Sequence, residues 1–419
     1  MRSFDVIVLG AGIVGVSSAI QLLRLGTQVA LVDRRDAGEE TSFGNSGIIQ
    51  REGMHPYVFP RDPGKLLAYA LNRKPEARWR FTSLPVVAPF LWRHFRSTSP
   101  AQARATYFAN VPLFARCLET HAELIELAGC ESLIAKSGWL SLRRALAVSA
   151  SLASALAELR DLGLDARELN ADELSLLEPD LNTREISAAI HYRDPWTVRD
   201  PGALVKAYAG WFCRSGGTFL NGDARTARRA AGTWQISTSE GELAADRIVV
   251  ALGPWSKPFL DSFGVRLPMG LKRGYHRHFR PVGPAKLRRP VFDSDNGFVL
   301  APVTAGTRLT TGAEFAALDA PPNPDQIDQC LPIARQWFPL GEPVEAAAWL
   351  GARPVMPDML PVIGEAPGVP RMWLHFGHAH HGLTLGPATG LLLAQMMAGQ
   401  TPYTDPAPYS ATRFLVERI

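Results

Sequence analysis

Three glycines near the N-terminus have the spacing that a phosphate-binding turn needs. Gly10, Gly12 and Gly15 fit the pattern G-x-G-x-x-G without deviation. In such a turn the first glycine permits the tight bend, the second lets the backbone approach a pyrophosphate, and the third brings the next helix close to the strand. Asp33 follows at the distance at which such motifs carry an acid, and its carboxylate can accept hydrogen bonds from an adenosine ribose. This spacing predicts a dinucleotide site but does not distinguish FAD from NAD.

The residues around these glycines predict the elements that must hold them. Residues 6–9 form a short apolar run of the kind found in a buried parallel strand, and residues 13–25 have a helical pattern. Gly26 ends that helix, and residues 29–32 form a second strand. The N-terminus of the helix would direct N–H groups and the positive end of its dipole at the phosphates. We therefore predict a strand–turn–helix–strand unit, and the alternative is a merely glycine-rich turn.

A second group of small and polar residues follows the second predicted strand. Segment 41–47, which reads Thr-Ser-Phe-Gly-Asn-Ser-Gly, offers hydroxyl groups, an amide and backbone N–H groups within a short length of chain. We expect it to line a polar ligand, and the alternative is a plain serine or Asx turn. Further candidates for the pocket entrance are Arg51, Glu52, His55 and Arg199.

The composition is that of an ordinary globular protein. With 419 residues, of which 20% are charged and 46% hydrophobic, the chain is long enough for two domains with separate cores. A net charge of +4 without a basic run gives no reason to expect a nucleic acid partner. Because the cysteines lack the spacing of a metal site, we expect no metal and four buried, reduced thiols: Cys117, Cys130, Cys213 and Cys330.

The sequence predicts a cytoplasmic protein. No apolar stretch reaches the roughly 18 residues that span a bilayer, and the chain enters the glycine-rich unit without a signal peptide. Residues 84–95 are apolar, aromatic and basic. They form either a helix packed on the core or a surface that rests on the inner face of the cell membrane. The oligomeric state is left open.

The order of the remaining elements indicates that the chain leaves the dinucleotide-binding domain and returns to it. A mostly helical region (64–130) precedes a strand (138–144) and a helix (145–163). A helix, a buried strand and a glycine turn then follow within residues 202–256, and residues 266–315 alternate like an antiparallel sheet. The last elements are a helix, a strand, a turn rich in glycine and histidine, and a closing helix, predicted at 325–338, 372–376, 377–384 and 386–398.

This order predicts a mixed α/β fold with two interleaved domains. A Rossmann-type domain that binds FAD would be entered three times by the chain, whereas a simple NAD dehydrogenase needs no such threading. The substrate domain would be built on a largely antiparallel sheet. We expect the FAD-binding domain at 1–60, 200–262 and 346–419, and the substrate domain at 61–199 and 263–345.

Taken together, these segments resemble the D-amino-acid oxidase superfamily of flavoenzymes, and within it the bacterial FAD-dependent D-amino-acid dehydrogenases. The resemblance covers almost the whole chain. It rests on the glycine motif with Asp33 and on five further segments, at residues 41–47, 249–256, 271–275, 351–358 and 377–384.

The resemblance implies an extended FAD. Its pyrophosphate would lie on the glycine turn, which includes Ile13 and Val14, and its ribose would lie near Asp33 and Arg34. The turn at 377–384 would direct N–H groups at the flavin edge that becomes negative on reduction. The other residues implied to bind the cofactor are Ser42, Asn45, Ser46, Gly47, Gly253, Trp255, Gly382, Leu383 and Thr384.

The resemblance also implies catalytic residues. Arg353 of the G-x-R-P motif would pair with the substrate carboxylate, and the alternative is a structural ion pair. Tyr275 would add a second bond to that carboxylate, and the alternative is a core aromatic. The last motif usually reads Gly-His-Gly, and here Ala379 replaces the second glycine, with His380 and His381 after it. We expect these two imidazoles against the flavin or over the substrate.

The implied activity is oxidative deamination of a D-amino acid, by hydride transfer from Cα to flavin N5. Electrons would pass to a quinone or another carrier. A pocket rich in histidine and arginine suits a polar, cyclic substrate such as D-proline or D-hydroxyproline. The alternatives are an oxygen-using oxidase of the glycine or sarcosine type and a flavin-binding subunit without turnover.

Overall fold

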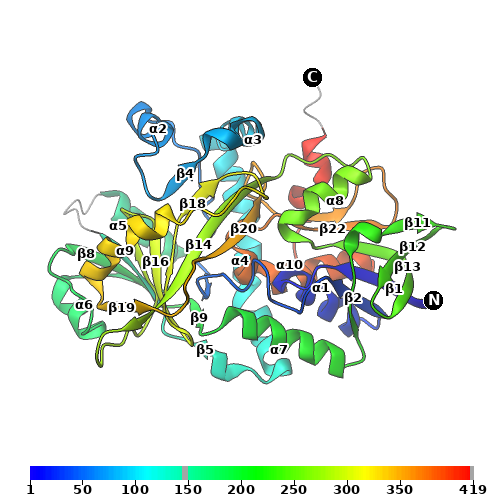
Figure 1. Cartoon of the computed structure of the whole chain (residues 1–419), viewed down its shortest axis with the longest axis horizontal. Coiled ribbons are helices and arrows are strands. Elements are labelled where there is room, and N and C mark those ends of the chain that lie inside the picture. The colour runs from blue at the N-terminus through cyan, green and yellow to red at the C-terminus, as the bar shows by residue number, and fades with distance from the viewer. Residues whose placement is uncertain (144–149, 416–419) are drawn as a thin grey trace.

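The computed structural model describes residues 1–143 and 150–415 of the chain. Two large sheets lie side by side, with β1, β2, β13 and β22 in one and β14, β16 and β8 in the other (Figure 1). The N-terminal blue segment and the orange-red C-terminal segment both lie in the first sheet's half of the molecule (Figure 1). The chain therefore leaves this half and comes back to it.

The first sheet has eight strands in the order β10-β2-β1-β13-β12-β11, and β22 pairs with the end of β13 and with β21. The strands β10, β2, β1, β13 and β22 run parallel, whereas β11, β12 and β21 pair antiparallel with their neighbours. The bounds are β1 Arg2–Leu9, β2 Val29–Asp33, β10 Thr218–Asn221, β11 Arg228–Ala230, β12 Thr233–Thr238, β13 Gly241–Val250, β21 Val362–Glu365 and β22 Met372–Phe376.

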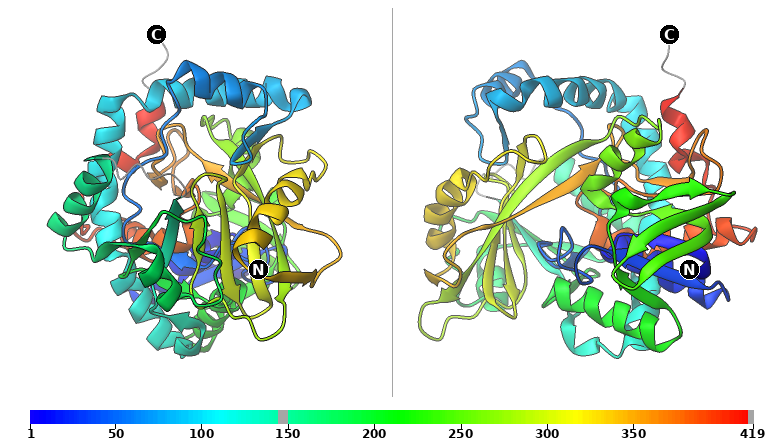
Figure 2. Two further views of the ribbon diagram at one scale, coloured as in Figure 1. Left: turned by 90° about the vertical axis from the view of Figure 1, so that its left-hand side faces the viewer. Right: turned by 45° about the vertical axis from the view of Figure 1, so that its right-hand side comes forward.

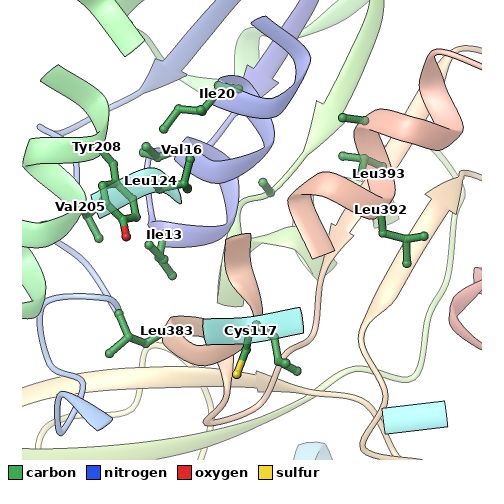
Figure 3. Packing of buried hydrophobic residues seen from close by; sticks show 14 of the residues in the cluster. Ile13, Val16, Ile20, Cys117, Leu124, Val205, Tyr208, Leu383, Leu392 and Leu393 are labelled. Atoms are coloured by element: carbon green, nitrogen blue, oxygen red, sulfur yellow. The ribbon is translucent and has the colours of Figure 1, made fainter. Parts of the chain in front are cut away.

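Four helices pack together beside this sheet: α1 (Ile13–Arg24), α4 (Pro100–Ala128), α7 (Pro201–Arg214) and α10 (Gly382–Met397). Apolar side chains from all four gather in one cluster, which includes Val16, Leu124, Val205 and Leu392 (Figure 3). The closest approach is between α1 and α10, where a Cβ on Gly390 would lie only 3.0 Å from the backbone of Ser17. The last helix of the chain is thus packed directly on the first.

The second sheet has eleven strands in the order β4-β18-β14-β17-β16-β15-β6-β8-β7, and β19 and β20 also pair with β14. Only β15–β6 and β18–β4 pair in parallel. The bounds are β4 Ala77–Trp79, β6 Trp139–Arg143, β7 Ala166–Leu169, β8 Ala188–Tyr192, β14 Gly270–Pro281, β15 Val291–Asp293, β16 Phe298–Val303, β17 Gly306–Thr310, β18 Ala313–Phe315, β19 Leu340–Pro343 and β20 Trp349–Val355.

A small three-stranded sheet and several short elements complete the fold. The small sheet has the order β3-β9-β5, and α2 and α3 form a ridge over the second sheet (Figure 2). The bounds are β3 Ile48–Ile49, β5 Ile134–Ala135, β9 Trp196–Val198, α2 Pro63–Ala70, α3 Leu84–Ser97, α5 Ala150–Asp161, α6 Ala171–Leu177, α8 Ser256–Ser262, α9 Asp325–Trp337, η1 Phe81–Ser83, η2 Glu131–Leu133, η3 Ala224–Thr226, η4 Gly253–Trp255, η5 Ala407–Tyr409 and η6 Ala411–Phe414.

The predicted mixed α/β fold is confirmed, with differences in detail. The third FAD-binding segment was expected from residue 346, but β20 pairs along its length with β14 and belongs to the second sheet. The closing helix begins at Gly382 rather than at 386. Residues 144–149, at the end of the predicted strand and the start of the predicted helix, lie outside the described residues. All four cysteines are free, but Cys213 is exposed and not buried as expected.

Candidate active site

A cavity of about 480 Å³ lies where the carboxyl ends of β1, β2, β13 and β22 meet β14 and β20 of the other sheet. In open parallel sheets, ligands bind beyond the carboxyl ends of the strands. One end of this cavity, called the Asp33 end below, is lined by Asp33, Arg34 and Trp255. The other, the Arg353 end, is lined by Arg353, Trp349 and His380. Each end therefore uses residues from different parts of the chain.

The glycine turn at the Asp33 end leaves one position open toward the cavity. A Cβ on Gly15 would overlap the carbonyl oxygen of Gly10, and Gly10 has φ +102, which L side chains rarely adopt. Gly12 differs, because a Cβ there would meet only Ser42 Oγ, at 3.3 Å. The backbone at Gly12 can therefore be approached closely, as a pyrophosphate requires. Ser42 Oγ also accepts a hydrogen bond from the Ile13 N–H at 3.0 Å and so ties segment 41–47 to the turn.

The carboxylate of Asp33 holds this turn from the side. Its Oδ2 accepts a hydrogen bond from the Ala11 N–H at 2.6 Å, and its Oδ1 accepts one from the Arg35 N–H at 3.1 Å. Burial raises the pKa of Asp33, although these backbone bonds oppose the shift. Each carboxylate oxygen accepts about two hydrogen bonds, so capacity remains for ribose hydroxyls.

A cation and an indole close the Asp33 end. The Arg34 guanidinium lies 4.4 Å from the ring centroid of Trp255, and its Nη2 donates to Glu40 Oε1 at 2.8 Å. This pair presents a flat surface to the cavity. Gly253 precedes it with φ +54, and no other atom lies within 4 Å of a Cβ built on Gly253.

At the other end, Arg353 extends from β20 over the backbone of β14. A Cβ on Gly274 would lie 2.6 Å from both terminal nitrogens of its guanidinium, so only glycine leaves room for it there. Its Nη1 donates to the Gly312 carbonyl at 3.0 Å, and burial lowers its pKa. No carboxylate of the described residues lies within 4.0 Å of it. The alternative of a structural ion pair therefore has no partner among the residues that the structure describes.

Tyr275 belongs to the cavity wall, but its side chain lies in the core of the second sheet, which corrects the expected role. Its side chain is 1% exposed and packs within the apolar cluster of that sheet. The hydroxyl donates to Glu314 Oε2 at 2.7 Å and accepts from the Asn323 N–H at 2.8 Å and from Arg273 Nη2 at 3.1 Å. Because these three partners occupy the hydroxyl, it has no capacity left for a substrate carboxylate.

The two consecutive histidines have different environments. His380 lines the cavity, and its ring centroid lies 4.8 Å from that of Tyr57. His381 lies behind the wall, where it contacts Phe114 edge-to-face at 4.9 Å and a Cβ on Gly53 would lie 2.8 Å from its Cε1. Burial lowers the pKa of both, that of His381 to about 3, so both are neutral near pH 7. Only His380 can contact a ligand, which corrects the expectation for His381.

The turn before these histidines holds an alanine in a glycine conformation. Ala379 has φ 53, and its N–H donates to the Pro354 carbonyl at 2.9 Å, next to Arg353. A left-handed backbone costs an L residue about 1–2 kcal/mol, which glycine avoids. The turn is thus docked on β20 despite an unfavourable residue at this position.

Several other predicted residues do not line the cavity. Gly15 acts through packing, as expected of the third glycine. Gly47 packs against β9, where a Cβ on this glycine would overlap the Val198 carbonyl. The neighbouring Ser46 does not line the cavity either. The Thr384 hydroxyl accepts from the Gln50 N–H at 3.1 Å and so ties α10 to segment 48–50. The cavity wall does include Gly10, Gly12, Ile13, Val14, Asp33, Arg34, Ser42, Asn45, Gly253, Trp255, Gly382 and Leu383.

The four candidates for the entrance lie elsewhere. Arg51 and Glu52 line a separate small hollow beside Tyr192. Burial raises the pKa of Glu52 to about 7, although its oxygens accept from Trp139 Nε1 at 2.8 Å and from the Arg51 N–H at 2.9 Å. His55 is paired with Glu158 at 3.2 Å, and Arg199 is exposed.

The sequence analysis missed Trp349, which lines the Arg353 end, and two side chains that lie beside this end without lining it, those of Lys272 and Tyr57. The Trp349 ring lies where a Cβ on Gly44 or Gly351 would overlap it, and it stacks on His276 at 4.8 Å. Lys272 pairs directly opposite Arg353 in the register of β14 and β20, and its Nζ lies 6.0 Å from the ring centroid of Tyr57. The resemblance had already marked the two segments that contain Lys272 and Arg353. What the sequence did not give was the pairing register of these two strands, which places Lys272 opposite Arg353.

Comparison with known proteins identifies the family. The family model described as DAO, FAD dependent oxidoreductase, matches residues 5–396. The chain belongs to this family. A D-amino-acid oxidase of Bradyrhizobium diazoefficiens is 34% identical over 426 residues, and the match covers 98% of this chain and 99% of the relative. A D-amino acid dehydrogenase of Chromohalobacter salexigens is 30% identical, with coverage of 98% and 99%.

Solved structures share the fold of this FAD-dependent oxidoreductase. Glycine oxidase from Geobacillus kaustophilus has a TM-score of 0.74 at 22% identity, with 99% of each chain covered. L-proline dehydrogenase from P. horikoshii has a TM-score of 0.75 at 17% identity, with 99% of this chain and 98% of the other covered. Within the described ranges, no helix is long and apolar enough to cross a membrane, and no group of three or more His, Cys, Asp or Glu side chains could hold a metal ion.

The oxidoreductase binds FAD, and the geometry of the cavity fits that cofactor. The open backbone at Gly12 and the N-terminus of α1 suit the pyrophosphate. The remaining acceptor capacity of Asp33 suits the ribose. Gly382 and Leu383, in the first turn of α10, line the cavity near Arg353 and direct the positive end of a 16-residue helix toward it. The residues present therefore match an extended dinucleotide. Its flavin, which becomes negative on reduction, would lie near the N-terminus of α10.

Proposed function

We propose that this protein is an FAD-dependent dehydrogenase of D-amino acids. The observation that carries the proposal is the position of Arg353, which faces the cavity over Gly274 without a carboxylate partner among the described residues. A planar guanidinium binds a carboxylate through two parallel hydrogen bonds. The names of relatives such as the Chromohalobacter salexigens dehydrogenase support the choice of a D-amino acid.

In this mechanism the protein binds and orients the substrate and needs no strong base. Arg353 holds the carboxylate, so the substrate Cα is fixed in one position. The substrate amine must be uncharged before Cα–H is lost, and His380 adds no positive charge because burial keeps its pKa well below the usual value. FAD, when bound, accepts the hydride that leaves Cα. The imino acid departs and is hydrolysed by water to an oxo acid and ammonia.

The Arg353 end also suits a cyclic secondary amine such as D-proline or cis-4-hydroxy-D-proline. Its wall contains the flat ring of Trp349 beside polar groups, which would accept a compact ring. The product would then be a cyclic imine. This is the narrower form of the proposal, and it is tested with the same substrates as the general one.

Anaerobic bleaching of the yellow flavin tests the proposal. The purified holoenzyme is mixed with D-amino acids, L-amino acids, N-alkyl amino acids, D-proline and cis-4-hydroxy-D-proline. We expect rapid bleaching by one or more D-amino acids and slow or no bleaching by their L enantiomers. Bleaching by L-amino acids or N-alkylglycines alone would refute the proposed substrate class, and a lack of bleaching by every compound would favour a subunit without turnover.

The second candidate function is an oxidase, because the Bradyrhizobium relative is named a D-amino-acid oxidase. We propose instead that electrons pass to a quinone or another carrier. After anaerobic reduction, the protein is mixed with oxygenated buffer or with a soluble quinone in a stopped-flow instrument. A dehydrogenase is expected to be reoxidised much faster by the quinone, and fast reoxidation by oxygen would establish the oxidase.

A quinone acceptor is consistent with a peripheral membrane contact, which we propose for the ridge formed by residues 61–108. This ridge holds nine basic and two acidic side chains, a net charge of +7 in a chain of net +4. It also carries exposed apolar side chains, with Phe81 79%, Val86 65% and Trp92 62% exposed. Basic and aromatic side chains on surface helices such as α2 and α3 favour an anionic lipid surface.

Vesicle sedimentation tests this contact. The holoenzyme should sediment with vesicles that contain phosphatidylglycerol and stay in the supernatant with pure phosphatidylcholine. The double variant F81A/W92A should sediment less, whereas Phe43→Ala, which removes an exposed aromatic distant from the ridge in sequence, should not change sedimentation. Equal sedimentation with both kinds of vesicle, or dimerisation through this face in gel filtration, would refute it.

A further inference from the structure

Arg353 is part of the cavity wall, Lys272 lies beside it outside the wall, and neither forms an ion pair with a described acid. Lys272 and Arg353 are direct partners in the antiparallel register of β14 and β20, so their side chains leave the sheet on the same face. The Lys272 Nζ lies 6.0 Å from the ring centroid of Tyr57 and 5.8 Å from that of Phe315. Tyr57 in turn contacts His380 of the cavity wall. These contacts place the ammonium next to the cavity.

Neither cation is neutralised by the described part of the protein. No ion pair links Lys272 or Arg353 to a carboxylate of the described residues. Burial, with Arg353 as the second cause, lowers the pKa of Lys272 to about 8, and no carboxylate acts against this shift. The other ionisable groups nearby, His94 and His380, are neutral near pH 7 because burial lowers their pKa values. Two like charges directly opposite each other on one sheet face destabilise it.

The positive charges of Arg353 and Lys272 determine how much negative charge a ligand must supply. A substrate with one carboxylate neutralises Arg353 and leaves the Lys272 ammonium without a counterion. A second carboxylate would neutralise it, whereas a hydroxyl group would not. We infer that the preferred substrate is a dicarboxylic amino acid, with its α-carboxylate on Arg353 and its second carboxylate on Lys272. This inference rests on the proposed function.

The second carboxylate has two chemical sources, a side chain as in D-aspartate and D-glutamate, or an N-linked group as in iminodiacetate. Anaerobic flavin reduction with each of these compounds separates the two. The amides D-asparagine and D-glutamine are the matched neutral substrates. An ion-paired hydrogen bond contributes about 1.5–3 kcal/mol. We therefore expect a preference of about 10- to 100-fold for the acid over its amide, in the ratio of reduction rate to dissociation constant.

Two variants test the residue. Lys272→Met keeps an unbranched side chain one atom shorter than lysine and removes the charge, so the preference should fall below about threefold. Lys272→Arg keeps the charge and should retain most of the preference. Flavin content and the visible spectrum show that each variant is folded.

Three results would overturn the inference. A wild-type enzyme that prefers D-glutamine to D-glutamate, or an acid preference that persists in Lys272→Met, would exclude a carboxylate on Lys272. If Lys272→Met lowered the ratio of reduction rate to dissociation constant equally for the acid and the amide, Lys272 would contact the substrate amine or stabilise the fold, not bind the second carboxylate. In each case bleaching by neutral D-amino acids would leave the proposed function standing, whereas absence of bleaching by all amino acids would overturn both.

Discussion

The glycine turn at the Asp33 end offers a ligand mainly backbone groups, whereas the Arg353 end offers side chains that come from parts of the chain far apart in the sequence. The glycine turn, the first turn of α1 and the N–H groups held by Asp33 shape the first end. Arg353, Trp349 and His380 shape the second, and Lys272 and Tyr57 lie beside it. Backbone recognition suits a cofactor that does not vary, and side-chain recognition can change with the substrate while the strands stay in place.

The largest effect is expected from Gly15→Ala at the Asp33 end. The added methyl group would overlap the Gly10 carbonyl, so the turn must move. We expect loss of bound FAD and destabilisation by about 3 kcal/mol or more, as for other severe overpacking. Flavin absorbance of the purified protein and urea unfolding measure both.

Gly210→Ala in α7 is the control for this substitution, because its Cβ would meet only the flexible end of Arg214. It should keep FAD and gain about 0.5–1 kcal/mol from helix propensity. A yellow, stable Gly15→Ala protein would show that the turn at this end is not held by its backbone.

The next largest effect is expected from Arg353→Met at the other end. FAD should stay bound, and the rate of flavin reduction over the dissociation constant should fall about 10²- to 10³-fold, because the partner of a charged hydrogen-bonded pair is removed. Stopped-flow bleaching measures this. Arg199→Met, which removes an exposed arginine away from the cavity, should have no effect. Similar rates in both variants would remove Arg353 from the site.

The variant Tyr275→Phe tests whether this residue stabilises the core of the second sheet or binds the substrate. Because the Tyr275 hydroxyl is bonded to Glu314 and Arg273, its loss should lower the free energy of unfolding by about 1–3 kcal/mol. Substrate affinity should change little. Tyr57→Phe should show the opposite pattern, with altered substrate affinity and nearly unchanged unfolding. Weaker substrate binding in Tyr275→Phe at unchanged stability would restore the role that the sequence suggested.

The last prediction concerns stability and pH at Lys272. Its pKa is about 8 in the folded protein and 10.5 in an unfolded chain, so between these values the unfolded state binds more protons. Stability contributed by this group therefore rises with pH from about 8 to 10.5. Lys272→Met should remove that rise and stabilise the protein at pH 7 by at most about 3 kcal/mol. Urea unfolding at pH 7 and 10 measures it, and a destabilised variant at pH 7 would contradict it.

The glycine turn of the Asp33 end could be predicted from the sequence because its determinants are local, whereas Trp255 was found only through the resemblance. The three glycines and Asp33 lie close together near the start of the chain, and their spacing alone implies the turn, the strand and the helix. Asp200 before Pro201 is likewise a local signal for the start of α7, where the Asp200 side chain accepts from the Ala203 N–H. Such short-range patterns depend little on the rest of the fold.

The Arg353 end could be predicted only in part. Arg353 was found through the resemblance, but the pairing of Lys272 with Arg353 depends on a register between strands that are distant in the sequence. Tyr275 was misassigned because alternation along β14 decides which face a side chain takes, and the neighbouring Glu314 and Asn323 come from later in the chain. Tyr57 lies in an irregular segment without any pattern. Non-local packing, not composition, determines this half of the site.

The route of the chain through the first sheet has a consequence for synthesis on the ribosome. The glycine turn follows β1 directly, but the neighbouring strand β13 begins only at Gly241, and β22 and α10 are made later still. The nascent chain therefore holds an open strand edge and an unfinished cavity until the segment 372–397 has emerged. FAD can therefore stabilise the protein only after α10 has been made, and a message truncated before α10 yields a chain that the cofactor cannot rescue.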